Sequence, residues 1–132
     1  MSNKHLTQWR HNRAFISTID PEYPDWAVTV AFYAALHAVD ALFKHDKVQG
    51  ITAHEHRNET LRATNRYRKI WECYRPLYDM SRTVRYVADP AQWVEWDQVE
   101  AQVLRRRLYP LEKSVCGLMR LDVQEPIELK PA

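Results

Sequence analysis

Glycine is scarce in this chain of 132 residues, which contains only Gly50 and Gly117. Tight β-hairpins usually need glycine in their turns, because the central residues of those turns adopt positive φ angles. Nor does the sequence alternate apolar and polar residues over more than a few positions. Both features argue against a β-sheet protein and favour helices joined by short loops.

Cysteine is also rare, and the two present, Cys73 and Cys116, have neither metal-binding nor redox spacing. We expect both to be reduced packing residues of a cytoplasmic protein; a surface disulfide is the less favoured alternative. The sequence contains no Gly-rich phosphate loop, no Ser-His-Asp order and no zinc-finger pattern. Because these motifs are absent, the sequence predicts no cofactor and contains no motif of this kind that would indicate an enzyme.

Charge of one sign is not in excess, since 19 basic residues stand against 17 acidic ones. This balance neither requires nor excludes nucleic acid as a partner. The polar N-terminus lacks the apolar core of a signal peptide. The only long apolar run, residues 26 to 43, contains His37 and Asp40, so we predict a buried helix and no membrane span.

Apolar residues make up 45% of the chain, enough to build a core. Their helical spacing predicts an antiparallel up-and-down bundle of four to five helices, an all-α fold. Pro24 suits a first helical turn, Thr52 with Glu55 has capping-box spacing, and Pro76 and Pro110 should kink or interrupt their helices. The expected helices cover about residues 3–19, 26–45, 52–64 and 70–87, with a last one containing Leu104 and Leu118. Residues 1–121 form the predicted single domain, and the Pro- and Glu-rich tail 122–132 should be poorly ordered.

A polar stripe lies on the otherwise apolar helix at 26 to 43. On a helical wheel Thr29, Tyr33, His37, Asp40 and Lys44 fall on one side. A polar group buried without a partner costs roughly 2–7 kcal/mol. The stripe therefore needs partners from other helices, or it must face solvent.

Candidate partners lie in the segments HEHR, at 54–57, and YDMSRTVRY, at 78–86. We predict a network of Asp40, His37, Arg57 and Arg82. Two alternatives remain open: a ligand pocket, and a metal site that combines His37 and Asp40 with His54 or His56. The chain lacks the ligand spacing of zinc proteases and of ferritin-like sites, so the network is preferred and no metal is predicted.

Three segments together carry a family resemblance. FYAALHAVDALF at 32–43, H-x-H-R at 54–57 and YRPLYDMSRTVRY at 74–86 resemble the HEPN superfamily (higher eukaryotes and prokaryotes nucleotide-binding domains). The resemblance covers roughly residues 14 to 88. It implies a short helical bundle that is often dimeric, in agreement with the helical pattern.

The resemblance implies one of two kinds of function. Some HEPN proteins are metal-independent ribonucleases with an Arg-x4–6-His motif, commonly toxins or phage-defence proteins, while others lack the motif and bind nucleotides, RNA or a partner nucleotidyltransferase. The resemblance thus also implies a toxin–antitoxin or phage-defence setting. All six histidines here lie at or before position 56, and no arginine precedes one at the required distance. The ribonuclease motif is absent, so we expect a non-catalytic, cytoplasmic, homodimeric binding protein.

The expected ligand is a nucleotide or RNA phosphate. Arginine binds such oxyanions in a bidentate manner, and tyrosine stacks on bases. The predicted ligand-binding or network residues are Tyr33, His37, Asp40, His54, Arg57, Tyr78, Arg82, Arg85 and Tyr86. In the alternative interpretation, the arginines form surface ion pairs with nearby Glu and Asp residues. Two other functions remain open: a divergent ribonuclease using His54, His56 and Arg57, and a dimerisation module without a ligand.

Overall fold

A computed structural model describes residues 3–87 and 89–132 of the chain. All regular secondary structure in these two ranges is helical, which confirms the all-α prediction. The helices are α1 (Lys4–Ile16), α2 (Pro24–His45), α3 (His54–Ala63), α4 (Arg68–Tyr86), α5 (Trp96–Gln98), the π-helical segment η3 (Val99–Leu108) and α6 (Tyr109–Met119), with single 3₁₀ turns at Asn65–Tyr67 and Pro90–Gln92.

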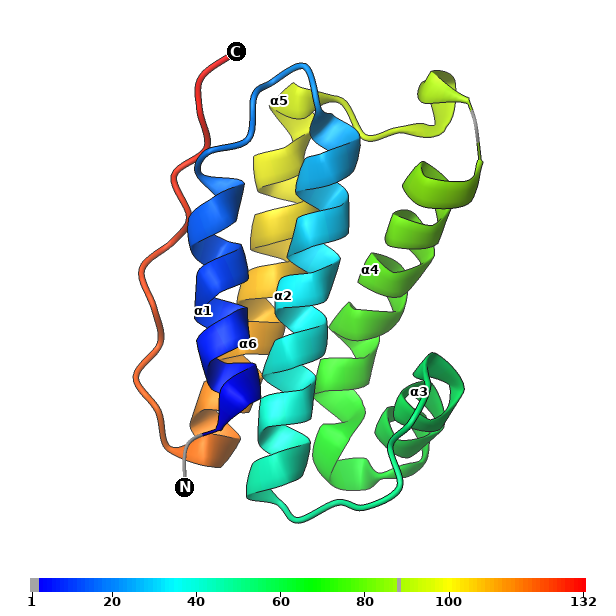
Figure 1. Ribbon diagram of the computed structural model, residues 1–132, viewed down its shortest axis with the longest axis vertical. Coiled ribbons are helices and arrows are strands. Elements are labelled where there is room, and N and C mark those ends of the chain that lie inside the picture. The colour runs from blue at the N-terminus through cyan, green and yellow to red at the C-terminus, as the bar shows by residue number, and fades with distance from the viewer. Residues whose placement is uncertain (1–2, 88) are drawn as a thin grey trace.

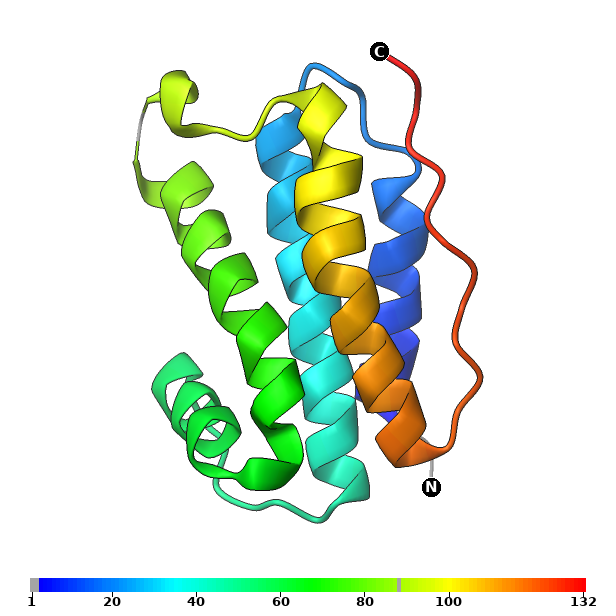
Figure 2. The same ribbon diagram turned by 180° about the vertical axis from the view of Figure 1, so that it is seen from behind.

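The long helices lie side by side and alternate in direction (Figure 1). α1 packs on α2, and α2 also contacts α4, η3 and α6, so that α2 is the central helix. α5, η3 and α6 follow one another along a single rod, which lies in front of α2 in the view of Figure 2. The short α3 packs against α4 at one edge of the bundle.

Two predicted helix starts have different outcomes. Pro24 occupies the first turn of α2, as predicted, where its missing N–H costs no hydrogen bond. The prediction of a capping box at Thr52 and Glu55 is wrong. Ala53 is the N-cap of α3 and makes no side-chain capping bond, because the Thr52 hydroxyl pairs instead with the His56 ring at 2.9 Å.

The two internal prolines also differ. α4 continues as one helix through Pro76, so the predicted restart does not occur. Pro110 is the second residue of α6, just after the π-helical segment, at whose end the Tyr109 N–H bonds to the Leu104 carbonyl five residues back. A proline clashes with the carbonyl four residues before it, and the wider π turn places that carbonyl elsewhere.

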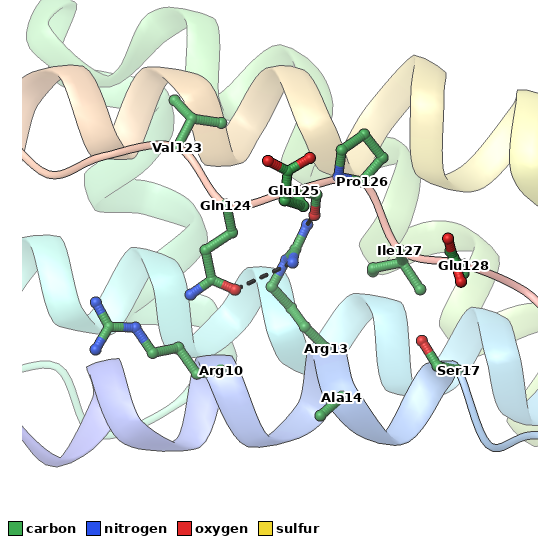
Figure 3. A pocket seen from close by; sticks show the side chains of 10 residues that line it. All are labelled: Arg10, Arg13, Ala14, Ser17, Val123, Gln124, Glu125, Pro126, Ile127 and Glu128. Atoms are coloured by element: carbon green, nitrogen blue, oxygen red, sulfur yellow. Dashed lines mark hydrogen bonds between the residues drawn. The ribbon is translucent and has the colours of Figure 1, made fainter.

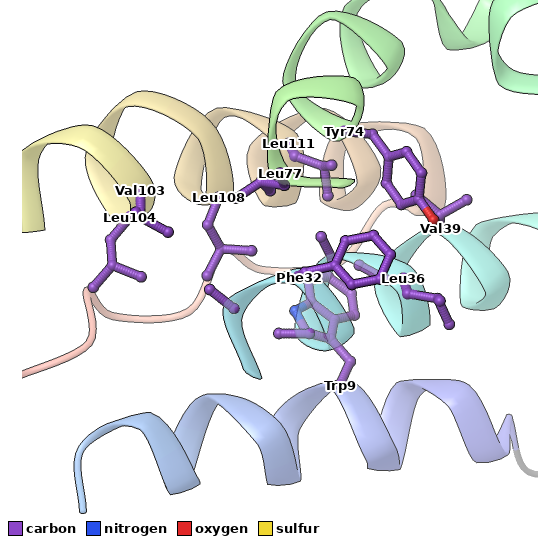
Figure 4. Packing of buried hydrophobic residues seen from close by; sticks show 14 of the residues in the cluster. Trp9, Phe32, Leu36, Val39, Tyr74, Leu77, Val103, Leu104, Leu108 and Leu111 are labelled. Carbon is purple, nitrogen blue, oxygen red and sulfur yellow. The ribbon is translucent and has the colours of Figure 1, made fainter. Parts of the chain in front are cut away.

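The core is formed where α1, α2, α4 and the rod η3–α6 meet. Trp9, Phe32, Tyr74 and Leu108 converge there and are almost completely buried (Figure 4). α2 is long and apolar enough to cross a membrane, but 78% of its apolar window lies inside the bundle. The central helix of a bundle has the same length and composition, and that is the position that α2 occupies here.

The tail after α6 is the segment for which the sequence predicts poor order. It has no regular structure but runs back along α1, where it borders a groove of about 580 Å³ (Figure 3). Arg13 donates to Gln124 and to the Glu125 carbonyl, and the Ile127 side chain is only 7% exposed. These contacts explain why a segment rich in proline and glutamate lies close to the bundle.

Candidate functional site

An ion pair joins the polar stripe on α2 to α3. The Arg57 guanidinium donates to both carboxylate oxygens of Asp40, over 2.8 Å from Nε and 2.9 Å from Nη2. Each side chain is largely removed from solvent, with 11% exposed for Arg57 and 13% for Asp40. A bidentate pair of this kind is among the stronger polar contacts in proteins, and it fixes α3 against α2.

His54 lies next to this pair, one turn before Arg57. Its Nδ1 is 3.4 Å from Arg57 Nη1. Burial lowers the pKa of His54, and the positive charges of Arg57 and Arg85 lower it further, whereas Asp40 opposes them. At neutral pH the imidazole is therefore uncharged and can accept a proton or a hydrogen bond.

His37 occupies the other side of Asp40. Its Nδ1 lies 3.0 Å from the Nδ1 of His5, a residue of the first turn of α1. Burial lowers the pKa of His37, as do His5 and Arg57, while Asp40 acts in the opposite direction. His37 thus shares the electrostatic environment of Asp40 and Arg57, but its hydrogen-bond partner is a residue that the sequence had not indicated.

A second group of predicted residues lines one groove between α3 and α4. The groove has a volume of about 310 Å³ and is lined by His54, Tyr78, Arg82, Arg85 and Tyr86. All but His54 come from α4, where a spacing of three to four residues places them on one face. Among the residues that the structure describes, no acidic one lines this groove, so its electrostatic character is positive.

Arg85 is held firmly in this groove. Its guanidinium donates to the Tyr33 hydroxyl over 2.8 Å, to the Ser81 carbonyl over 3.1 Å and to the Ser81 hydroxyl over 3.2 Å. It also lies 5.1 Å from the centre of the Tyr86 ring. Since arginine has five N–H donors and these bonds use three, two remain to bind a ligand.

Arg82 is the more exposed cation. It stacks on the Tyr78 ring at 5.7 Å and is 3.5 Å from the Tyr78 hydroxyl. Within residues 3–87 and 89–132 neither Arg82 nor Arg85 forms an ion pair with a carboxylate. Of the surface ion pairs expected in the alternative interpretation, the one between Arg62 and Glu59 is present, whereas Asp79 faces Arg75.

The predicted residues thus form two adjoining groups. Asp40, Arg57 and His54 are in direct contact, with His37 beside them. Arg82 and Arg85 line the groove, and Tyr33 accepts a hydrogen bond from Arg85. Arg82 makes no bond with Asp40 or Arg57, so the predicted four-residue network is not continuous. Sequence reasoning missed His5 because it lies on a different helix, and no local spacing links that helix to the stripe.

Comparison of the chain with models of known protein families, with curated proteins and with solved structures finds no match. The HEPN resemblance therefore stays a prediction that depends on the three sequence segments. The groove itself brings together two guanidinium groups, two tyrosine rings and a neutral imidazole, with no carboxylate among the described residues that line it.

Proposed function

We propose that this protein is a HEPN-like up-and-down helical bundle that binds the phosphate of a nucleotide or of RNA without cleaving it. The binding site is the groove lined by His54, Tyr78, Arg82, Arg85 and Tyr86. The observation that carries the proposal is that Arg82 and Arg85 face this groove without a carboxylate partner among the described residues.

Phosphate recognition is the task for which this pair of arginines is suited. A guanidinium presents parallel N–H donors to two oxygens of one phosphate, which an ammonium group does less well. The bonds from Arg85 to Tyr33 and Ser81 fix its orientation before a ligand arrives. A group held in place in this way loses less conformational entropy on binding.

The tyrosines supply the surface for a base. Tyr86 is 70% exposed, which is unusual for so large an apolar ring in a small protein, and Tyr78 lies partly buried beside His54. Stacking of a base on an aromatic ring contributes about 1–3 kcal/mol and tolerates any base. A single-stranded RNA or a free nucleotide, with unpaired bases, fits this surface better than a duplex.

Arg57 takes a different role from the one expected. It was predicted to clamp phosphate with Arg82 and Arg85, but both of its donor edges toward Asp40 are occupied and only 9% of the residue is exposed. In the proposed function Arg57 positions α3, and with it His54, at the edge of the groove.

The experiment is a binding titration of fluorescein-labelled single-stranded RNA, followed by fluorescence anisotropy at several salt concentrations. Arg82→Gln and Arg85→Gln should each weaken binding at least tenfold. Each should also reduce the slope of log K against log salt by about 0.7, the value for one lost phosphate contact with a single strand. Calorimetry with free nucleotides shows whether a mononucleotide suffices.

Arg75→Gln is the matched control, because Arg75 lies on the same helix but outside the groove and faces Asp79. It changes the net charge equally and should leave affinity nearly unchanged. An equal loss of RNA affinity in Arg75→Gln would mean that RNA binds only by nonspecific charge attraction. A flat response of both affinity and thermal stability to RNA and nucleotides would favour a dimerisation module instead.

A divergent ribonuclease is the competing function, and the neutral imidazole of His54 beside the two arginines is the observation in its favour. His56 is exposed and bonds to Thr52, so it lies apart from this groove. Incubation with RNA in EDTA separates the two functions. Cleavage that His54→Ala abolishes would establish the enzyme, whereas intact RNA agrees with binding alone.

The proposal includes the expected cellular setting of a cytoplasmic homodimer with a nucleotidyltransferase partner, in a toxin–antitoxin or phage-defence system. These features follow from the resemblance and not from the geometry of the groove. Co-purification of the protein with the product of a neighbouring gene tests the partner directly.

A further inference from the structure

His5, His37 and Asp40 come together beside the Asp40–Arg57 ion pair, from the start of α1 and the middle of α2. One ligand atom from each lies within 4.8 Å of those from the other two. The side chains are partly exposed, so an ion can reach them from solvent. We propose that these three residues bind a divalent transition-metal ion, such as Zn²⁺ or Co²⁺.

The two histidines carry most of the argument. Their Nδ1 atoms face each other at 3.0 Å. Two uncharged nitrogen lone pairs at this distance repel each other unless a proton or a cation lies between them. Two imidazole nitrogens bound to one zinc ion, each at about 2.0–2.1 Å, are roughly 3.3–3.4 Å apart at the tetrahedral angle. The two Nδ1 atoms therefore need to separate by only about a few tenths of an ångström to share a metal ion.

Asp40, the third ligand, completes a set of ligands that suits a divalent transition-metal ion. Two imidazoles and a carboxylate are typical ligands of zinc and its neighbours, while calcium and magnesium prefer oxygen ligands alone. Asp40 uses one acceptor position on each oxygen for Arg57, and a carboxylate has about four in all. It can therefore bind an ion while it stays hydrogen-bonded to Arg57.

Arg57 acts on this site in two opposite ways. Its bonds hold the Asp40 carboxylate in one orientation, as partners of metal ligands commonly do. Its positive charge also repels a bound cation, which lowers the affinity. The net effect favours an exchangeable ion over a permanently bound structural one.

Space for further ligands exists beside the cluster. His5 and Asp40 line a groove of about 440 Å³ together with Phe43, Lys47 and Ile51, among others. Three protein ligands leave at least one coordination position of a tetrahedral ion open. That position faces a groove in which water or a small anion fits.

The test uses untagged protein stripped with EDTA and then titrated with ZnCl₂ by calorimetry and with CoCl₂ by visible absorption. We expect one ion per chain, a cobalt spectrum of the strong four-coordinate type and a higher Tm in the presence of zinc. His5→Ala and His37→Ala should each reduce zinc affinity at least tenfold, since loss of even an outer partner costs 10–100-fold.

His11→Ala is the matched control, because His11 is an exposed histidine on the same helix as His5 and lies outside the cluster. It should bind zinc as the parent protein does. Circular dichroism of each variant shows whether the fold is retained; His5 is the more informative position because its replacement leaves the bonds between Asp40 and Arg57 intact.

Two results would contradict the proposed metal site. One is that the protein does not bind one zinc ion per chain, and the other is that folded His5→Ala binds zinc as tightly as the parent protein. Neither result bears on RNA binding, since Arg82 and Arg85 belong to a separate groove. The two proposals therefore stand or fall independently.

Discussion

At the scale of single residues, loss of the bond between Asp40 and Arg57 should destabilise the protein strongly. Asp40→Ala leaves the guanidinium of Arg57 largely buried without its counter-charge. Removal of one member of a buried ion pair costs about 3–5 kcal/mol, and the partial exposure here places the expected loss near 3 kcal/mol. Urea unfolding of the two proteins, with midpoint and slope fitted together, measures it.

Asp79→Ala supplies the comparison for this prediction. Asp79 also faces an arginine, Arg75, but the two lie 3.9 Å apart and are both more than 60% exposed. Exposed pairs contribute about 0–1 kcal/mol, so this variant should stay close to the parent protein. Similar losses in Asp79→Ala and Asp40→Ala would mean that burial does not set the strength of the Asp40 pair.

Asp46 predicts how stability changes in acid. Burial alone would raise the pKa of its carboxyl group, but hydrogen bonds from Arg66, Tyr67 and His45 outweigh burial and lower the pKa to about 2. A carboxyl group whose pKa is lower in the folded state stabilises that state above its unfolded pKa, near 3.9. This stabilisation should therefore be lost as the pH falls from about 4 to 2.

Asp46→Asn tests that assignment. The variant should be less stable at pH 7 by on the order of 1–2 kcal/mol, after allowance for solvent screening, and its stability should fall less steeply between pH 4 and 2. Thermal melts at a series of pH values measure both effects. Glu59→Gln, at an exposed pair with Arg62, is the control and should keep the parent's acid profile.

At the scale of elements, the sequence predicts a helix well when its apolar face is continuous. The predicted start of α2 differs from the observed one by about two residues, and the predicted end is the observed one. The prediction succeeds because α2 is apolar on most sides, and a helix of that kind must be buried. α1 ends at Ile16, three residues before the predicted end. The start of α3 was predicted to within about two residues, but its cap was wrong because the hydroxyl of Thr52 bonds to His56, and a spacing rule does not include competition between partners.

The tail is the element for which composition was least informative. Prolines and glutamates predict weak packing, yet Ile127 is buried, and its N–H donates to the Tyr109 hydroxyl over 2.7 Å. Ile127→Asp should destabilise the protein by about 2–3 kcal/mol, since it removes a buried aliphatic side chain and places a charge there. Val123→Asp, at a side chain that is 57% exposed, should change stability by less than about 0.5 kcal/mol.

Chemical denaturation of both tail variants provides the measurement. Equal stability of Ile127→Asp and Val123→Asp would mean that the tail does not pack as the structure has it. In that case the predicted poor order of residues 122–132 would hold.

At the scale of the whole molecule, the sequence predicts which candidate-site residues share one side of a helix, but contacts between helices become known only from the fold. Periodicity alone placed His37 and Asp40 on one side of their helix, and Arg82 and Arg85 on one side of theirs. Which of these groups meet depends on how helices distant in sequence are packed. That packing joins Asp40 to Arg57 and brings His5 to His37, whereas it leaves Arg82 with Tyr78.

The whole molecule should also unfold in one step, because α1, α2, α4 and the rod η3–α6 contribute to one core. Tryptophan fluorescence and far-ultraviolet circular dichroism should give the same Tm, as expected for a two-state single domain. An earlier loss of helical signal would show that α3, which packs mainly on α4, melts by itself.

The predicted homodimer leads to a separate expectation for thermal unfolding. When dissociation is coupled to unfolding, Tm rises with protein concentration. A Tm that stays constant over a hundredfold range of concentration, with a monomer mass from light scattering, would contradict the dimer and leave the single domain untouched.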